Sequence, residues 1–175
     1  IKDSKSITFE MTNNSAMWAE IDINGTVYRV YNVHLETTGI NSALHKAAKA
    51  QASGMEVHGN SLLNAIYGSY TVGMISRASQ ANTVAMDMRE AEVPILVCGD
   101  FNDVPYSYVY NTMHGDKIDS FKECGSGFMH TFRGGKKMVR IDYIFHDKAL
   151  EGVSFYKKDL SYSDHYPVFL RIATK

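Results

Sequence analysis

The stretch VCGDFNDVPYS, residues 97–107, joins an apolar run to a cluster of polar side chains. The run over 93–98 is short and strongly apolar, which is typical of an interior strand. Gly99 lets the backbone turn at the end of that strand. Asp100 and Asn102 lie two positions apart, so in extended backbone their side chains would share a face. A simple turn or a helix N-cap is the alternative explanation for these polar residues.

Two alternating runs before this stretch predict a β-hairpin. MWAEIDI and VYRVYNVHL flank Asn24-Gly25, which is a strong signal for a tight turn between strands. Apolar residues on both faces of the second run predict an interior strand covered on both sides. Asn32 and His34 end one face, so both side chains reach the same side at the strand's tip. SITFEM, before the hairpin, alternates as a further strand.

Residues 37–92 have helical character and form an insertion between two strands. Met74, Ala78, Ala81, Ala85 and Met88 recur at steps of four and three, which predicts a helix from about 70 to 92, stopped by Pro94. ALHKAAKAQA and SLLNAIYG, within 40–67, predict shorter helical pieces on the surface.

Further strands follow the opening stretch. We expect a short helix after Pro105, a loop-rich stretch up to Met138, and strands over 140–145, 152–158 and 166–172. Strands at both ends with helices between them predict an α/β or α+β layered fold in a single domain, residues 1–175.

Composition excludes some classes of protein. The chain is 45% apolar, which is enough for a sizeable core, and its 18 basic residues nearly balance 19 acidic ones. This balance, without a basic stripe, argues against binding nucleic acid through bulk positive charge. No stretch is long and apolar enough to span a membrane. Cys98 and Cys124 lack the spacing of a metal site, and Cys98 is expected to be a buried thiol.

Polar groups stand at four predicted strand ends: NVHLE, GDFND, RIDYIF and YSDHYPV. Each has a structural explanation by itself: a solvated or satisfied His34, a turn at Asp100, Asp142 paired with Arg140, a turn at Ser-Asp-His. Together they supply what phosphoester hydrolysis needs. Carboxylates hold a hard metal ion, an imidazole acts as base or acid, and Asn and His⁺ donate to the charge that develops on phosphate.

These four motifs in this order resemble the C-terminal half of the endonuclease/exonuclease/phosphatase superfamily, which includes pancreatic deoxyribonuclease. The resemblance extends from about residue 6 to 172. It implies half or more of a four-layer α/β/β/α sandwich, with the active site at one end of the packed sheets.

The resemblance also implies a role for each matching residue. His34 resembles the histidine near the scissile phosphate. Asp100 resembles the aspartate that orients the attacking water, and Asn102 the asparagine that binds a phosphate oxygen. A last group comprises Asp142, which would orient an imidazole, Asp164 as a metal ligand, and His165 as the base or a phosphate contact.

The sequence departs from the superfamily pattern in the N-terminal part of the domain. There the superfamily supplies an Asn and a metal-binding Glu, and neither Glu10, Glu20 nor Glu36 stands in the expected order. We expect half of the sandwich to be missing, which leaves an apolar sheet face open to self-association. With few oxygen ligands, metal affinity should be weak, and this chain alone should show little Mg²⁺-dependent activity.

The expected function is hydrolysis of a phosphoester by in-line attack of activated water, with Mg²⁺ or Mn²⁺ as cofactor. Superfamily substrates include nucleic acid, lipid headgroups and nucleotide derivatives, and we expect the loops 37–70 and 114–138 to select among them. Lys136 and Lys137 lie in the second loop and are either substrate contacts or solvated. The alternative function is a non-catalytic binding or scaffold module that retains the fold; a nucleic-acid-binding domain without hydrolysis is disfavoured by the charge balance.

Overall fold

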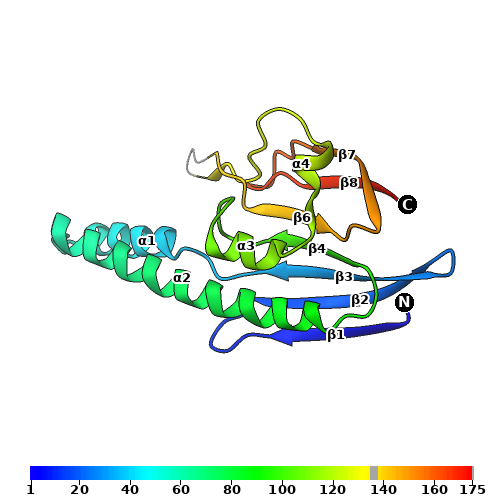
Figure 1. Ribbon diagram of the computed structural model, residues 1–175. Helices are drawn as coiled ribbons and strands as arrows, with labels where there is room; N and C mark the ends of the chain where they lie inside the picture. The colour runs from blue at the N-terminus through cyan, green and yellow to red at the C-terminus, as the bar shows by residue number, and fades with distance from the viewer. Residues whose placement is uncertain (135–137, 175) are drawn as a thin grey trace.

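The structure, a computed structural model, describes residues 1–134 and 138–174 (Figure 1). Lys136 and Lys137 lie outside these residues. The strands are β1 Asp3–Thr8, β2 Ser15–Ile23, β3 Thr26–His34, β4 Ile95–Asp100, β5 Ile118–Asp119, β6 Asp142–His146, β7 Leu150–Lys157 and β8 Val168–Thr174. The helices are α1 Ile40–Ala52, α2 Gly59–Arg89, α3 Tyr108–His114 and α4 Ser120–Cys124.

Six strands form one sheet in the order β1-β2-β3-β4-β6-β5, and β7 pairs with β8 in a separate hairpin. β3 and β4 run parallel because α1 and α2 carry the chain back between them, whereas the other neighbours in the sheet are antiparallel. Figure 1 shows α2 and α3 on one side of the sheet and the β7–β8 hairpin beside β6. The predicted mixed α/β fold is confirmed.

The predicted Asn24-Gly25 hairpin is confirmed, since β2 and β3 pair up to that turn and both turn residues have positive φ angles. Tyr31 and Val33 of β3 are buried in the core with residues of α2 and α3. β3 is an interior strand, as expected, but its two faces are not equally covered. On the second face Asn32 and His34 are exposed to solvent, because the helical layer lies on the first face alone.

Helix α2 is longer than the sequence pattern predicted. SLLNAIYG does not form a separate piece: it belongs to the same 31-residue helix as residues 70–89, because no proline interrupts the stretch and helices tolerate isolated glycines at modest cost. Gly73 packs closely against the loop after β3, since a Cβ there would lie 2.3 Å from the Thr37 carbonyl oxygen. α1 lies alongside α2, as Figure 1 shows.

The stretch predicted to be loop-rich holds two short elements, β5 and α4. A two-residue strand carries no periodicity, so the sequence gives no signal for it. Helix α3 begins at Tyr108 and not directly after Pro105, because the Ser107 side chain accepts a hydrogen bond from the Tyr110 backbone N–H and caps the helix.

The sheet face opposite the helices is partly open. Met17 and Ile23, which point away from the helical layer, remain 48% and 47% exposed. Part of the expected uncovered apolar face is therefore present on β2. Self-association through this face stays a prediction. No helix among residues 1–134 and 138–174 combines the length and apolar character needed to cross a bilayer.

Candidate active site

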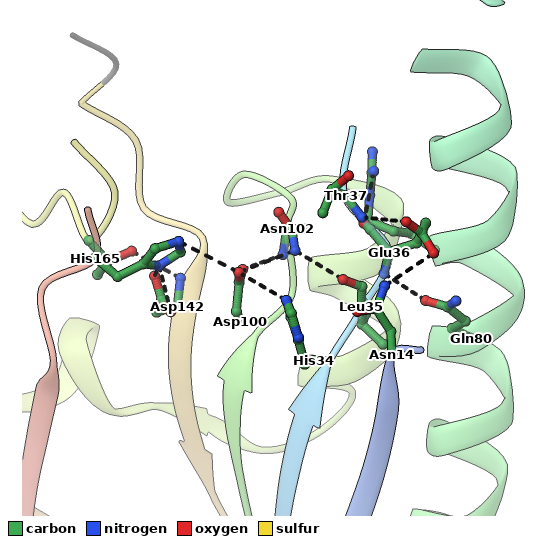
Figure 2. Close-up of polar contacts among 12 residues, drawn as sticks. Asn14, His34, Leu35, Glu36, Thr37, Gln80, Asp100, Asn102, Asp142 and His165 are labelled. Carbon is green, nitrogen blue, oxygen red and sulfur yellow. Dashed lines mark hydrogen bonds and ion pairs between the residues drawn. The ribbon is translucent and has the colours of Figure 1, made fainter. Parts of the chain in front are cut away.

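Three neighbouring strands bring three predicted site residues into one row. His34 at the end of β3 pairs with Asp100 at the end of β4, and Asp100 pairs with Asp142 at the start of β6. Paired residues on adjacent strands project from the same face of a sheet. We call His34, Asp100 and Asp142 the strand-end row; it lies on the face opposite the helical layer (Figure 2).

Gly99 allows β3 and β4 to approach closely enough to form this row. Its φ is +140°, and a Cβ would lie only 1.9 Å from the Val33 carbonyl oxygen. The expected role of Gly99, a turn at the end of the strand, is therefore wrong: the residue lies inside β4, and any side chain there would collide with β3. The Leu35 N–H donates to the Asp100 carbonyl oxygen at 3.0 Å and extends the pairing beyond the strand.

Asn102 contacts Asp100, but through a turn and not through extended backbone. Its φ is +51°, so the expectation of two side chains on one strand face is wrong. The Asp100 carboxylate accepts from the Asn102 backbone N–H at 2.8 Å and from its amide group at 3.2 Å, and the amide also donates to the Leu35 carbonyl at 2.9 Å. Both amide hydrogens are thus engaged, and Asn102 holds Asp100 against β3.

His165 enters from the loop before β8 and completes the cluster. Its Nδ1 lies 2.9 Å and 3.2 Å from the two carboxylate oxygens of Asp142. A proton on Nδ1 that donates to this carboxylate leaves Nε2 directed at Asp100, 3.9 Å away. The His34 Nε2 lies 3.7 Å from the same Asp100 oxygen. Figure 2 shows Asp100 between the two imidazoles.

The ionisable groups of this cluster shift one another's pKa values. Burial, together with the nearby Asp142 carboxylate, raises the pKa of Asp100 to about 6. The hydrogen bond that His165 donates to the Asp142 carboxylate, together with the charges of the surrounding carboxylates, raises the pKa of His165 against the opposing effect of burial. A carboxyl group that titrates near neutrality at the end of a strand is typical of a functional site.

A group of side chains in the cluster has the chemistry of a cation site. Ligand atoms of Asp100, Asp142 and His165 lie within 4.8 Å of one another, and two of the three residues are carboxylates. Asp164, the metal ligand implied by the resemblance, lines the same cavity but is exposed and does not belong to this group. The structure therefore places Asp164 at the rim of the cavity.

The cluster opens into a cavity of about 420 Å³, one wall of which is helix α2. Tyr70 and Arg77 project from that helix into the wall. The Arg77 side chain is only 1% exposed; it donates to the Glu36 carbonyl at 3.1 Å, and its Nε lies 3.6 Å from Asp103 without a hydrogen bond. Sequence reasoning missed Arg77, although it is a lone charge in the otherwise uncharged stretch 59–86.

Arg140 does not pair with Asp142, so that alternative explanation for Asp142 is wrong. Arg140 instead forms a buried bidentate pair with Asp119, at 2.6 Å and 3.0 Å, which leaves Asp142 for His165. The Thr131 hydroxyl accepts from the backbone N–H of Asp142 and fixes the start of β6. Cys98 is half-buried, and burial raises the pKa of its thiol.

Comparison with known proteins gives a family match and solved structures of similar fold. The chain matches the model of the Endonuclease/Exonuclease/phosphatase family over residues 8–165. No curated protein sequence matches it. A solved endonuclease/exonuclease/phosphatase from Bacteroides vulgatus is 18% identical, with a TM-score of 0.67, over 99% of this chain and 65% of that chain.

Two further solved structures share the fold. Bacteroides thetaiotaomicron mannosyl-6-phosphatase Bt3783 is 17% identical, with a TM-score of 0.57, over 91% of this chain and 57% of that one. D. rerio TDP2 complexed with single strand DNA product is 15% identical, with a TM-score of 0.64, over 98% and 67%. The chain thus spans 57% to 67% of the length of these two structures.

Proposed function

The chain belongs to the endonuclease/exonuclease/phosphatase family, and on this premise we propose that it carries the catalytic centre of a divalent-metal-dependent phosphoester hydrolase. The observation that carries the proposal is the position of Asp100. Its carboxylate lies within 4 Å of both His34 and His165, beside Asp142, and its pKa is raised to about 6.

Each residue of the cluster would have its own role in in-line hydrolysis. Asp100 is ionised above about pH 6 and can take a proton from an attacking water, since a base with a pKa near neutrality transfers protons efficiently. His34, whose side chain is 57% exposed, donates to a phosphoryl or leaving oxygen in the cavity. His165, oriented by Asp142, donates from Nε2 to developing negative charge when it is protonated. Asn102 holds Asp100 in place.

The donor set fits a divalent cation. Of the group Asp100, Asp142 and His165, the two carboxylates would hold Mg²⁺ or Mn²⁺, with Asp164 at the rim as a further carboxylate. His165 donates from Nδ1 to Asp142 and keeps Nε2 for the substrate. The repulsion between Asp100 and Asp142, which contributes to the raised pKa of Asp100, is the strain that a cation would relieve. When bound, the cation neutralises negative charge on the phosphate. Few oxygen ligands predict weak affinity in this chain alone.

The test compares the complete protein with the 175-residue chain on bis(p-nitrophenyl) phosphate and p-nitrophenyl phosphate, with Mg²⁺, with Mn²⁺ or with EDTA. We expect metal-dependent release of p-nitrophenol by the complete protein and much less by the chain alone. His165→Ala and Asp100→Ala should each lower the rate by at least about a hundredfold. Asp116→Asn, an 82% exposed carboxylate away from the site, is the matched control.

The non-catalytic scaffold remains the second candidate. It predicts no hydrolysis of either ester by the complete protein under any metal condition, and equal behaviour of His165→Ala and Asp116→Asn. The intact cluster of two imidazoles and two carboxylates favours the hydrolase, because a scaffold needs no carboxyl group with a pKa near neutrality.

A further inference from the structure

One stripe of side chains follows helix α2 along almost its whole length. At alternating steps of four and three residues, one face of a helix presents Leu63, Tyr67, Tyr70, Met74, Arg77, Ala81, Val84 and Met88. All are apolar or aromatic except Arg77. We call Leu63, Tyr67, Tyr70 and Met74 the outer half of the stripe and the other four the inner half.

The two halves have opposite environments. The inner half is buried, with residues 0% to 5% exposed, and its apolar members belong to the core against the sheet. The outer half is 40% to 69% exposed: Leu63 52%, Tyr67 69%, Tyr70 40% and Met74 44%. Figure 1 shows the reason, because α2 continues past the edge of the sheet at which β3 and β4 end.

The outer half adjoins the candidate active site. Tyr70 and Arg77 lie two helical turns apart on the stripe, and both line the cavity that contains Asp100 and His165. From Tyr70 the exposed side chains lead outward to Tyr67 and Leu63. Leu63 and Met74 are eleven residues apart, so the outer half is about 16 Å long at 1.5 Å per residue. A ligand whose phosphate lies in the cavity can therefore extend along it.

The charges near the outer half select the chemistry of that ligand. Residues 59–76 carry no acidic or basic side chain. The two tyrosines could stack on bases, but a nucleic acid strand needs cations along its backbone phosphates. This stretch of α2 offers none, and the neighbouring lysines, Lys46 and Lys49, belong to α1 and not to the stripe. An uncharged surface with aliphatic and aromatic side chains is suited to hydrocarbon.

We propose that the outer half of the stripe inserts into the surface of a phospholipid bilayer and brings a lipid phosphoester to the catalytic cluster. Arg77 marks the boundary: beyond it the stripe is buried in the protein core, and before it the stripe contacts the acyl region of the lipid. This inference rests on the proposed function for its substrate, but the docking step itself requires no catalysis.

A second copy of the chain is a poorer occupant for this surface. Four side chains along about 16 Å of helix provide much less than the 1,200–2,000 Å² buried in a typical stable interface. A partner helix on the stripe would also cover Tyr70 and the mouth of the cavity. A bilayer surface needs only the exposed side chains and leaves a headgroup free to enter.

The test measures co-flotation of the complete protein, with the 175-residue chain in parallel, with phosphatidylcholine vesicles in the presence of EDTA, where no hydrolysis occurs. We expect the wild-type protein to bind, with little change on addition of salt, because the four inserted side chains carry no charge. Leu63→Ser/Tyr67→Ser should weaken binding by roughly tenfold or more, from the apolar area removed. Neither residue lines the cavity, so the cluster is left intact.

Two matched variants separate this surface from other exposed apolar groups. Met86→Ser changes a 58% exposed residue of α2 that lies off the stripe, and Met17→Ser changes a 48% exposed residue on the open sheet face. We expect both to bind vesicles as the wild type does. Absence of wild-type binding, an equal loss in Met17→Ser, or a stripe-dependent dimer in solution would overturn the proposal.

Two further measurements complete the test. One distinguishes nucleic acid from lipid as the ligand, and the other separates docking from catalysis. Tighter binding of a single-stranded oligonucleotide than of vesicles, with loss in Leu63→Ser/Tyr67→Ser, would replace the lipid by nucleic acid and overturn the proposal. In the complete protein, the same variant should raise the KM for a vesicle-borne phosphodiester several-fold and leave bis(p-nitrophenyl) phosphate unchanged. Vesicle binding without hydrolysis of any ester would sustain docking and reject only the proposed function.

Discussion

Replacement of Asp100 by asparagine should stabilise the metal-free chain near neutral pH, although it removes a site residue. The folded state raises the pKa of this carboxyl from 3.8 to about 6. The folded protein therefore holds the Asp100 proton more tightly than the unfolded chain does. Stability from this group is present at low pH and is lost as the pH rises from about 4 through about 6.

The size of the pKa shift of Asp100 sets the expected change in the free energy of unfolding. About two pKa units at about 1.4 kcal/mol each correspond to about 3 kcal/mol of destabilisation above pH 6. Asparagine removes this cost, but it accepts fewer hydrogen bonds than the carboxylate, which takes two from Asn102; a lost hydrogen bond costs about 1 kcal/mol. The net gain is about 2 kcal/mol, or about 4–8 °C in Tm for a chain of this size.

The assay is thermal and urea unfolding in EDTA, at neutral pH and at about pH 4, where the wild-type carboxyl is already protonated. The gain should be present at neutral pH and absent or reversed in acid. Asp116→Asn changes the net charge equally at an 82% exposed position, so it should change stability by less than about 0.5 kcal/mol. Destabilisation of Asp100→Asn at neutral pH, or an equal gain in acid, would refute the reasoning.

Two further substitutions probe the support of the site. Asp142→Asn removes the hydrogen-bonded charge that raises the pKa of His165 and part of the repulsion on the neighbouring carboxyl, so both pKa values should fall in an NMR titration; an unchanged His165 would contradict the assigned contact. Gly73→Ala places a Cβ 2.3 Å from the Thr37 carbonyl and should cost about 1–3 kcal/mol in urea unfolding. Gly68→Ala has open space around it and should be neutral or stabilising, so an equal effect of both variants would show that the close approach is unimportant.

Strong local patterns were sufficient for much of the fold. The hairpin at Asn24-Gly25 and the apolar strand before Asp100 were predicted because turn chemistry and strand periodicity act over a few residues. The extent of α2 was not predicted, since its first half lies outside the hydrophobic core and most of its side chains are exposed. β5 and α4 were missed because elements this short are stabilised by their tertiary neighbours.

The sequence anticipated that most of the candidate site residues meet, but not their geometry, and their catalytic roles stay predictions. His34, Asp100, Asp142 and His165 come together because three strand ends and one loop meet, as the order of the motifs implied. The left-handed turn at Asn102 depends on the approach of β3, which a linear pattern does not contain. Arg77 was missed for a similar reason: its importance comes from burial at the cavity wall, and its sequence neighbours give no chemical motif.

The parallel pairing of β3 and β4 has a consequence for how the molecule folds. β1, β2 and β3 are consecutive and meet through short turns, whereas β4 joins β3 only after the whole of α1 and α2 has been traversed. Closing so long a loop costs chain entropy before any contact between the two strands is gained. We expect the meander to form first and the pairing of His34 with Asp100 to form late. The chemistry of this chain would then appear only at the end of its folding, and a site-directed probe at Asp100 would report the final step of assembly.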